Sequence, residues 1–201
     1  MPSRPVFVVT GPSGAGKGTL IKGLLERLPG LGVAVSATTR PQRPGEVDGR
    51  DYWFLSDDEF TRRVDADQFL EWVPYVSGHR YGTLRSEMDR IAADDRVCVL
   101  DLELEGALRV QDEVARSVTI FIAADVDELE RRLRERATES TGEIGERIDL
   151  AREQLERAHD FRYMVRNDEI ERATAALAAL VECELGGARK PESQRPRSGR
   201  L

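Results

Sequence analysis

Residues 6–28 have the sequence VFVVTGPSGAGKGTLIKGLLERL, an apolar run followed by a glycine-rich loop and a segment with leucines at helical spacing. Pro5–Thr10 is apolar and rich in β-branched side chains, which is typical of a strand buried on both faces of a parallel sheet. The leucine spacing predicts a helix over Thr19–Leu28 that ends at Pro29-Gly30. The loop between them, GPSGAGK at residues 11–17, matches the G-x-x-x-x-G-K pattern of a phosphate-binding loop, in the strand–loop–helix context that this pattern requires.

We call residues 11–17 the phosphate loop. Its glycines allow backbone N–H groups to surround a phosphate, the start of the helix adds a positive end, and Lys17 is expected to reach the β- and γ-phosphates. Gly18 stands where the motif has Ser or Thr to help hold Mg²⁺, and Thr19 comes next, as in the loop of adenylate kinases. We therefore expect Mg²⁺ to arrive with ATP and to be held mostly by phosphates and waters. The residues expected to bind ATP here are Gly11, Pro12, Ser13, Gly14, Ala15, Gly16, Lys17, Gly18 and Thr19.

Composition narrows the function classes. The 201 residues are 40% hydrophobic and 33% charged, which is typical of a globular protein with its own core. No apolar run is long enough for a membrane helix and the N-terminus does not resemble a secretory signal, so we expect no membrane partner. Two cysteines and two histidines exclude a disulfide framework and argue against a dedicated metal site. The net charge of −7 argues against nucleic-acid binding, and we expect a cytoplasmic protein.

Further apolar runs at 97–102, 118–123 and 163–165 alternate with helical patterns at 84–93, 126–136, 145–158 and 169–185. This alternation predicts an α/β fold, with a three-layer parallel sheet. Residues 36–83 break the alternation and are expected to form an inserted small lobe, with a helix from Ser56 to about Val64. A further strand is expected over residues 33–36, and residues 137–145 are expected to be mobile. The last residues, 186–201, have a basic composition without periodicity and are predicted to be a disordered tail.

The segment SATTRPQRPGE, residues 36–46, places Arg40 and Arg43 three residues apart in a proline-flanked loop. Two guanidinium groups at this spacing can clamp one phosphate, and Tyr52 and Tyr81 can add hydroxyl donors. Taken by itself, the segment fits a solvated basic loop somewhat better than a phosphate clamp.

The segments SATTRPQRPGEVDGRDYWF, FLEW, YGT and VLDLELEG follow in an order and at spacings that resemble guanylate kinases, over about residues 5–185. The resemblance implies one domain over residues 1–185, with a P-loop core formed by 1–35, 84–136 and 160–185. It also implies that the lobe at 36–83 binds the nucleoside monophosphate and that 137–159 form a helical lid. The implied reaction transfers the γ-phosphate of ATP to GMP and gives ADP and GDP.

The same resemblance assigns roles to residues of the GMP site. Arg40, Arg43, Tyr52 and Tyr81 would hold the GMP phosphate. Ser36, Glu71 and Thr83 would recognise guanine, whose N1–H and N2–H₂ donors suit a carboxylate. Asp101 falls at the first acid of the family's D-x-D-x-x-G segment and Glu103 replaces the second, and both are expected in the GMP site.

The resemblance also implies arginines near the phosphates of ATP, the phosphoryl donor. Arg132, Arg136 and Arg147 would approach the ATP phosphates when the lid closes and would neutralise charge on the transferred group, with Lys17, as catalytic residues. The alternative is a charged helix whose arginines form ion pairs with nearby glutamates. Asn167 would lie near the adenine, and its alternative is an ordinary turn after a strand.

Two other functions are compatible with the pattern. A sugar-phosphate kinase such as ribose bisphosphate phosphokinase resembles guanylate kinase, but it has no guanine for Glu71 to recognise. A non-catalytic guanylate-kinase-like binding module would have lost the phosphate loop, whereas Gly11, Gly16 and Lys17 are present here. We therefore expect a kinase for GMP.

Overall fold

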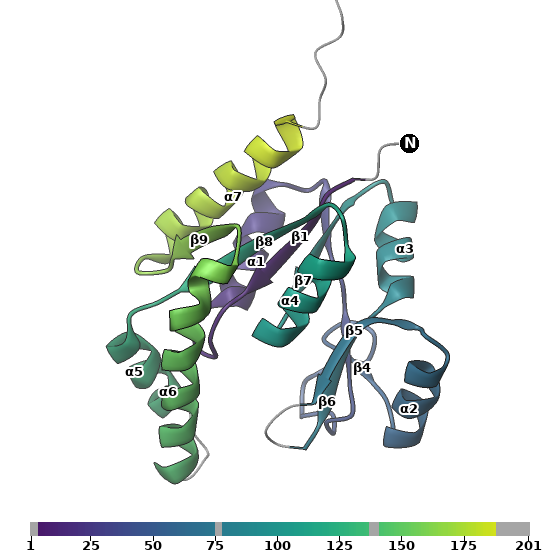
Figure 1. Ribbon diagram of the computed structural model, residues 1–201, viewed down its shortest axis with the longest axis horizontal. Helices are drawn as coiled ribbons and strands as arrows, with labels where there is room; N and C mark the ends of the chain where they lie inside the picture. Colours follow the sequence, from purple (N-terminus) through teal and green to yellow (C-terminus); the bar gives the residue numbers. More distant parts are fainter. Residues whose placement is uncertain (1–3, 75–77, 137–140, 188–201) are drawn as a thin grey trace, which may run out of the picture.

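The core of the protein is a five-stranded sheet in which every strand pair is parallel, with the order β2-β7-β1-β8-β9 (Figure 1). The computed structural model describes residues 4–74, 78–136 and 141–187, and within these it describes only the backbone of 133, 135, 136, 141–144, 146 and 147. The strands are β1 (Val6–Thr10), β2 (Leu31–Val33), β7 (Val97–Asp101), β8 (Ser117–Ala123) and β9 (Tyr163–Arg166). The predicted α/β fold with a parallel sheet is confirmed.

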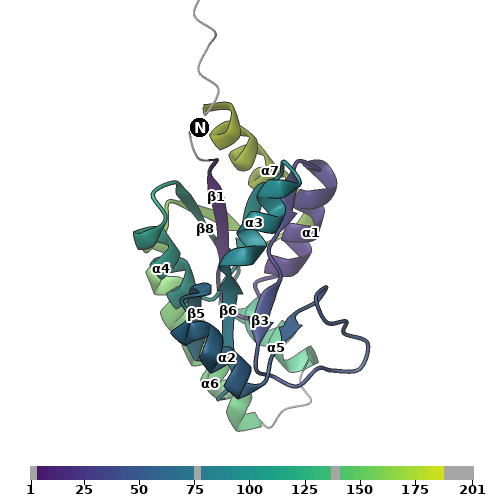
Figure 2. The ribbon, with the colours of Figure 1, turned by 90° about the vertical axis from the view of Figure 1, so that its right-hand side faces the viewer.

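Helices cover both faces of this sheet, which explains why β1 is buried at every position. Phe7 and Val9 of β1 point to one face and Val6 and Val8 to the other. The first face is covered by α1 (Lys17–Arg27), α5 (Val126–Arg136) and α7 (Ile170–Gly187), and the second by α3 (Arg85–Ala93), α4 (Leu104–Glu113) and the 3₁₀ turn η1 (Arg157–Asp160). Figure 2 shows α1 and α4 on opposite sides of β1. The helix α6 (Thr141–Glu156) packs against α5.

A second, four-stranded sheet has the order β4-β3-β6-β5 and lies within residues 36–84. Its strands are β3 (Ser36–Thr38), β4 (Trp53–Phe54), β5 (Phe69–Pro74) and β6 (Arg80–Leu84), and its helix is α2 (Asp57–Asp65). Phe60 of α2 stacks on Phe69 of β5 at a centroid distance of 4.4 Å, in a separate small core. The small lobe is therefore a sheet with its own core, placed beside the carboxyl ends of the main strands (Figure 1).

Three sequence-based predictions of local structure are wrong in their bounds. The strand expected at 33–36 is two strands in different sheets, because the chain crosses from the core to the small lobe at Ala34 and Val35. The Ala34 N–H still donates to Val99 of the core, at 3.0 Å. The helix expected from residue 145 begins at Thr141, so the mobile segment expected over 137–145 is helical from that residue on. The first two residues of the expected disordered tail belong to α7, and residues 188–201 lie outside the described part of the chain.

The described helices do not include any that is long and apolar enough to cross a membrane.

The contact between α1 and α7 predicts an unusual response to a helix-favouring substitution. A Cβ at Gly23 would lie 2.8 Å from the Thr174 Cγ2 atom. Gly→Ala inside a helix normally stabilises by about 0.5–1 kcal/mol. Gly23→Ala should instead lower the free energy of unfolding by about 1–3 kcal/mol through overpacking, as measured by urea denaturation.

Two variants serve as controls for this prediction. Gly18→Ala lies in the same helix, where a Cβ meets nothing within 4 Å, and should raise the unfolding free energy. Thr174→Ser removes the methyl group that clashes, so adding it to Gly23→Ala should restore part of the lost stability. A Gly23→Ala protein as stable as Gly18→Ala would contradict the packing argument.

Candidate functional site

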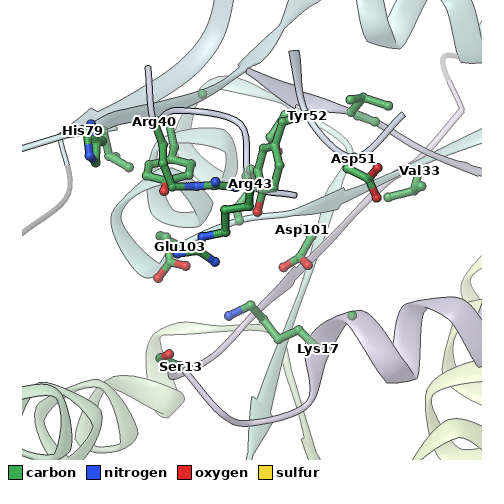
Figure 3. Close-up of a pocket in the computed structure, with 18 of the residues that line it drawn as sticks. Ser13, Lys17, Val33, Arg40, Arg43, Asp51, Tyr52, His79, Asp101 and Glu103 are labelled. Atoms are coloured by element: carbon green, nitrogen blue, oxygen red, sulfur yellow. The ribbon is translucent and has the colours of Figure 1, made fainter. Parts of the chain in front are cut away.

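A cleft of about 1520 Å³ separates the carboxyl ends of the main strands from the small lobe (Figure 3). It gathers residues from parts of the chain that are far apart in sequence. The predicted site residues that line it are Pro12, Ser13, Gly14, Gly16, Lys17, Gly18, Thr19, Ser36, Arg40, Arg43, Tyr52, Glu71, Tyr81, Asp101 and Glu103. The structure therefore brings the predicted phosphate loop and the predicted arginine pair to one cavity.

The phosphate loop forms the wall of the cleft next to the core. Gly11 and Gly16 have φ angles of 143° and 87°, and a Cβ at Gly16 would lie 2.5 Å from the Asn167 Nδ2 atom, so both positions require glycine. The Lys17 ammonium donates to the Gly11 carbonyl at 2.8 Å. Lys17 is thus held over its own loop, with its side chain directed into the cleft (Figure 3).

Asn167 supports the phosphate loop from behind. It is 1% exposed, its Nδ2 donates to the Ala15 carbonyl at 2.7 Å, and its backbone N–H donates to Ala123 at 2.7 Å. Its Oδ1 is buried and has no hydrogen-bond partner among the described residues. Asn167 therefore keeps an acceptor available beside the loop.

A second cavity, of about 550 Å³, opens on this side of the loop and includes Asn167 and Arg132. Arg132 donates from Nε to Glu128 at 2.7 Å and from NH1 to the Gly14 carbonyl at 3.2 Å. The helical ion pair expected as the alternative role for Arg132 is present, and the same side chain also contacts the phosphate loop. The side chains of Arg136 and Arg147 lie outside the described residues.

The opposite wall of the cleft carries Arg40 in a fixed orientation. The Glu46 carboxylate accepts from Arg40 NH2 at 2.8 Å and NH1 at 3.1 Å, and it also accepts from the Arg43 backbone N–H at 2.8 Å. The Arg40 guanidinium lies 5.2 Å from the Tyr52 ring centroid, and its side chain is only 10% exposed. Arg40 is therefore not a freely solvated side chain.

Sequence reasoning missed Glu46, although it stands in the quoted segment. Its position three residues after Arg43 could have indicated its role. A turn at Pro44 and Gly45 brings a carboxylate at this position back to the arginines. Other lining residues were also missed, mainly because they depend on where the chain crosses between the sheets: Val33, Ala34, Val35, Pro41, Gln42, Pro44, Arg50, Asp51, Val73, His79, Gly82, Leu102 and Leu150.

Glu71 of β5 lines the cleft and is 5% exposed. Its Oε1 has no hydrogen-bond partner among the described residues. Burial raises its pKa to about 7, although hydrogen bonds from Thr83 and the charge of Arg109 act in the opposite direction. A Cβ at Gly106 would lie 2.5 Å from Oε2, so this glycine leaves room for the carboxylate. Thr83 itself is buried behind Glu71, outside the lining of the cleft.

Asp101 is the last residue of β7, Glu103 comes two residues later, and both face the phosphate loop. In Figure 3 the Asp101 carboxylate lies between Lys17 and Tyr52. Burial raises the pKa of Asp101, and the charge of Lys17 opposes that shift. The described residues hold no cluster of three or more acidic, histidine or cysteine side chains arranged for a metal ion.

Comparison with known proteins gives consistent matches over almost the whole chain. The family model described as guanylate kinase matches residues 3–184. A guanylate kinase of Symbiobacterium thermophilum is 40% identical, over 92% of this chain and 89% of its own length. A guanylate kinase of Synechococcus elongatus is 44% identical, over 88% of this chain and 96% of its own. The crystal structure of guanylate kinase from Anaplasma phagocytophilum has the same fold, with a TM-score of 0.74 and 24% identity over 92% of this chain and 87% of its own.

The burial of Glu71 predicts a pH-dependent contribution to stability. Its pKa is about 7 in the folded protein, against an ordinary value of 4.5. Between these values the folded state keeps the proton and the unfolded state has lost it, so stability falls as the pH rises. Glu71→Gln removes this titration. In ligand-free protein, the unfolding free energy of the wild type minus that of the variant should fall by about 3 kcal/mol between pH 4.5 and 8. A difference in unfolding free energy that stays constant with pH would contradict the raised pKa of Glu71.

Proposed function

The chain belongs to the guanylate kinase family, and we propose that the cleft holds the reacting phosphates of ATP and GMP between its two walls. The enzyme is a nucleoside monophosphate kinase that transfers the γ-phosphate of ATP to GMP and gives ADP and GDP. The observation that carries the proposed arrangement is that Lys17 and the Arg40–Arg43 pair line one cavity from opposite walls. Two phosphate-binding groups that face each other fit a direct transfer between two phosphates.

We assign the acceptor phosphate to the small lobe. Arg40 and Arg43 supply two positive charges, and Tyr52 and Tyr81 supply hydroxyl donors. Glu46 already fixes one edge of the Arg40 guanidinium, so little side-chain entropy remains to be lost when the phosphate binds. Arg40 also donates to the Pro41 carbonyl at 2.7 Å, so a bound phosphate would compete for the remaining N–H donors of its guanidinium.

We assign the guanine to the part of the cleft at Glu71. A buried carboxylate oxygen without a partner is costly unless a ligand supplies donors, and guanine offers N1–H and N2–H₂. Ser36 lines the same cleft, and Thr83 holds the Glu71 carboxylate from behind.

The donor nucleotide would occupy the phosphate loop and the cavity beside it. Lys17 would exchange the Gly11 carbonyl for phosphate oxygens. Arg132, Arg136 and Arg147 would add positive charge that stabilises the negative charge of the transition state. This electrostatic stabilisation is the main contribution to catalysis of phosphoryl transfer. The Asn167 Oδ1 would accept from the amino group of adenine. Closure of residues 137–159 as a lid would exclude water from the phosphates and limit hydrolysis of ATP.

Mg²⁺ fits the residues of the cleft as an ion carried by ATP. Asp101 and Glu103 face the phosphate loop, and Mg²⁺ usually keeps several waters while it binds one or two carboxylates and the substrate phosphates. Gly18 has no hydroxyl group that could bind the ion. Asp101 and Glu103 would bind it through its waters. When bound, the ion neutralises charge on the phosphates. The cytoplasmic location expected from the sequence stays a prediction.

An assay with ATP and a panel of acceptors tests this function directly. GMP should be the best acceptor among GMP, AMP, IMP and ribose 1,5-bisphosphate, with ADP and GDP as products. A preference for ribose 1,5-bisphosphate would indicate a sugar-phosphate kinase. Binding of GMP without turnover would indicate a non-catalytic binding module.

Lys17→Ala should lower kcat by about 10²–10³-fold, the typical cost of one preorganised electrostatic donor at a transferring group. The variant should fold normally, because the hydrogen bond described for the Lys17 side chain goes to its own loop and does not join separate elements. Lys22→Ala on the exposed face of the same helix is the matched control and should keep the wild-type rate. Wild-type turnover by a folded Lys17→Ala protein would remove the phosphate loop from the mechanism.

Glu71→Gln should impair guanine selection more than phosphoryl transfer. The amide replaces one acceptor with a donor that faces the donors of guanine. The value of kcat/KM for GMP should fall by about tenfold to several hundredfold, since hydrogen bonds to charged groups contribute about 1.5–3 kcal/mol each. The loss for AMP should be much smaller, because adenine has no hydrogen on N1. Steady-state kinetics with both acceptors make the comparison.

Gly106→Ala is a second way to test the same contact without changing charge. The added methyl would push the Glu71 carboxylate out of its place, so this variant should reproduce the GMP-specific loss. Glu113→Gln, exposed at the end of the same helix, is the control. Equal losses for GMP and AMP would mean that Glu71 does not recognise guanine.

A further inference from the structure

Glu87 is a carboxylate that is 3% exposed, lies outside the lining of the cleft and accepts hydrogen bonds from three separate groups. Its Oε2 accepts from the Val35 backbone N–H at 2.8 Å. Its Oε1 accepts from the Trp53 indole N–H at 3.2 Å. Arg90, one turn further along α3, donates to both oxygens, with its shortest distance 2.7 Å. Both oxygens are therefore fully used, and the charge is paired.

The first of these partners marks the place where the chain enters the small lobe. Val35 lies between β2 of the main sheet and β3 of the second sheet. The chain returns to the core where β6 ends at Leu84 and α3 begins at Arg85, so Glu87 belongs to the first turn after the return. Arg90 also donates to the Val33 carbonyl at 3.3 Å. One ion pair thus ties the outgoing connection of the lobe to its returning connection.

The second partner connects Glu87 to the phosphate-binding side of the lobe. Trp53 begins β4 and directly follows Tyr52, whose ring lies under the Arg40 guanidinium. The Trp53 indole also lies against Gly49, where a Cβ would be 2.9 Å from the ring and where φ is +73°. Trp53 therefore anchors the end of the loop that carries both arginines.

We propose that Glu87 is a positioning residue for the GMP site: it fixes the arginine-bearing wall of the cleft relative to the core. The proposal rests on the proposed function, because the groups it positions are those assigned to the GMP phosphate. Three donors converge on Glu87 from the entry, the return and the loop, and only a carboxylate accepts all of them while balancing Arg90. A glutamine at this position offers one acceptor and turns an N–H₂ group toward N–H donors.

Two variants separate positioning from folding. Glu87→Gln disturbs all three contacts, whereas Trp53→Phe removes only the indole N–H and keeps an aromatic ring against Gly49. Both should raise KM for GMP, by roughly tenfold for Glu87→Gln and about threefold for Trp53→Phe, within the range of about 2–13-fold that corresponds to the net contribution of one hydrogen bond. The KM for ATP should stay within about twofold of the wild-type value, because the hydrogen-bond partners described for Glu87 are Val35, Trp53 and Arg90, none of which belongs to α1 or the phosphate loop. Asp89→Asn, exposed on the same helix, is the control for the change in charge.

Trp53 also provides a readout that does not depend on catalysis. The protein has two tryptophans, so Trp72→Phe leaves Trp53 as the single fluorophore. In that background, Glu87→Gln should shift the Trp53 emission and increase its quenching by acrylamide in ligand-free protein, at temperatures well below unfolding.

The outcomes are distinct. A raised KM for GMP in both variants, with unchanged KM for ATP, supports the positioning role. Lower unfolding free energy with wild-type KM values for both substrates would show that Glu87 only stabilises the fold, and it would overturn the proposal. A change in both KM values to the same extent would overturn it as well. A wild-type protein that does not phosphorylate GMP would refute the proposed function, and the fluorescence result would then still report whether Glu87 holds Trp53.

Discussion

The support of the phosphate loop by Asn167 is the interaction on which the site depends most. The loop follows β1, the central strand, and β1 is bonded to parallel neighbours on both sides. The loop itself is rich in glycine, and the amide of Asn167 reaches from the end of β9 to the Ala15 carbonyl. The site proposed for the donor phosphates is thus held by the first strand of the chain and by the turn after its last strand.

The sequence predicts those parts of the fold whose pattern is local. β1 and the helices α2 and α5 are found where the apolar runs and helix signals indicate them, including the Ser56 cap of α2. The same holds for the phosphate loop, because its glycines and Lys17 are contiguous. The spacing of Arg40 and Arg43 is local as well. The contacts of Arg40 with Glu46 and with the Tyr52 ring, however, depend on how the loop closes.

What the sequence does not predict is where the chain moves from one sheet to another. Residues 33–36 are compatible with one strand, and nothing local indicates that Ala34 bonds to the core while Val35 bonds to Glu87, 52 residues away in the sequence. The raised pKa of Glu71 is of the same kind, since its cause is burial against Gly106 on a different element. Such features follow from tertiary packing, which pattern and propensity do not determine.

The small lobe leaves and rejoins the core at neighbouring points. Ser36 at its entry pairs with Thr83 at its exit, in adjacent antiparallel strands. A segment whose two ends already lie side by side can be exchanged for another without moving the elements that flank it. The small lobe is in this sense an insertion into the scaffold that carries the phosphate loop. If it binds the acceptor as proposed, changes of acceptor specificity can accumulate within the insertion, while the strands that carry the phosphate loop keep their sequence and their packing.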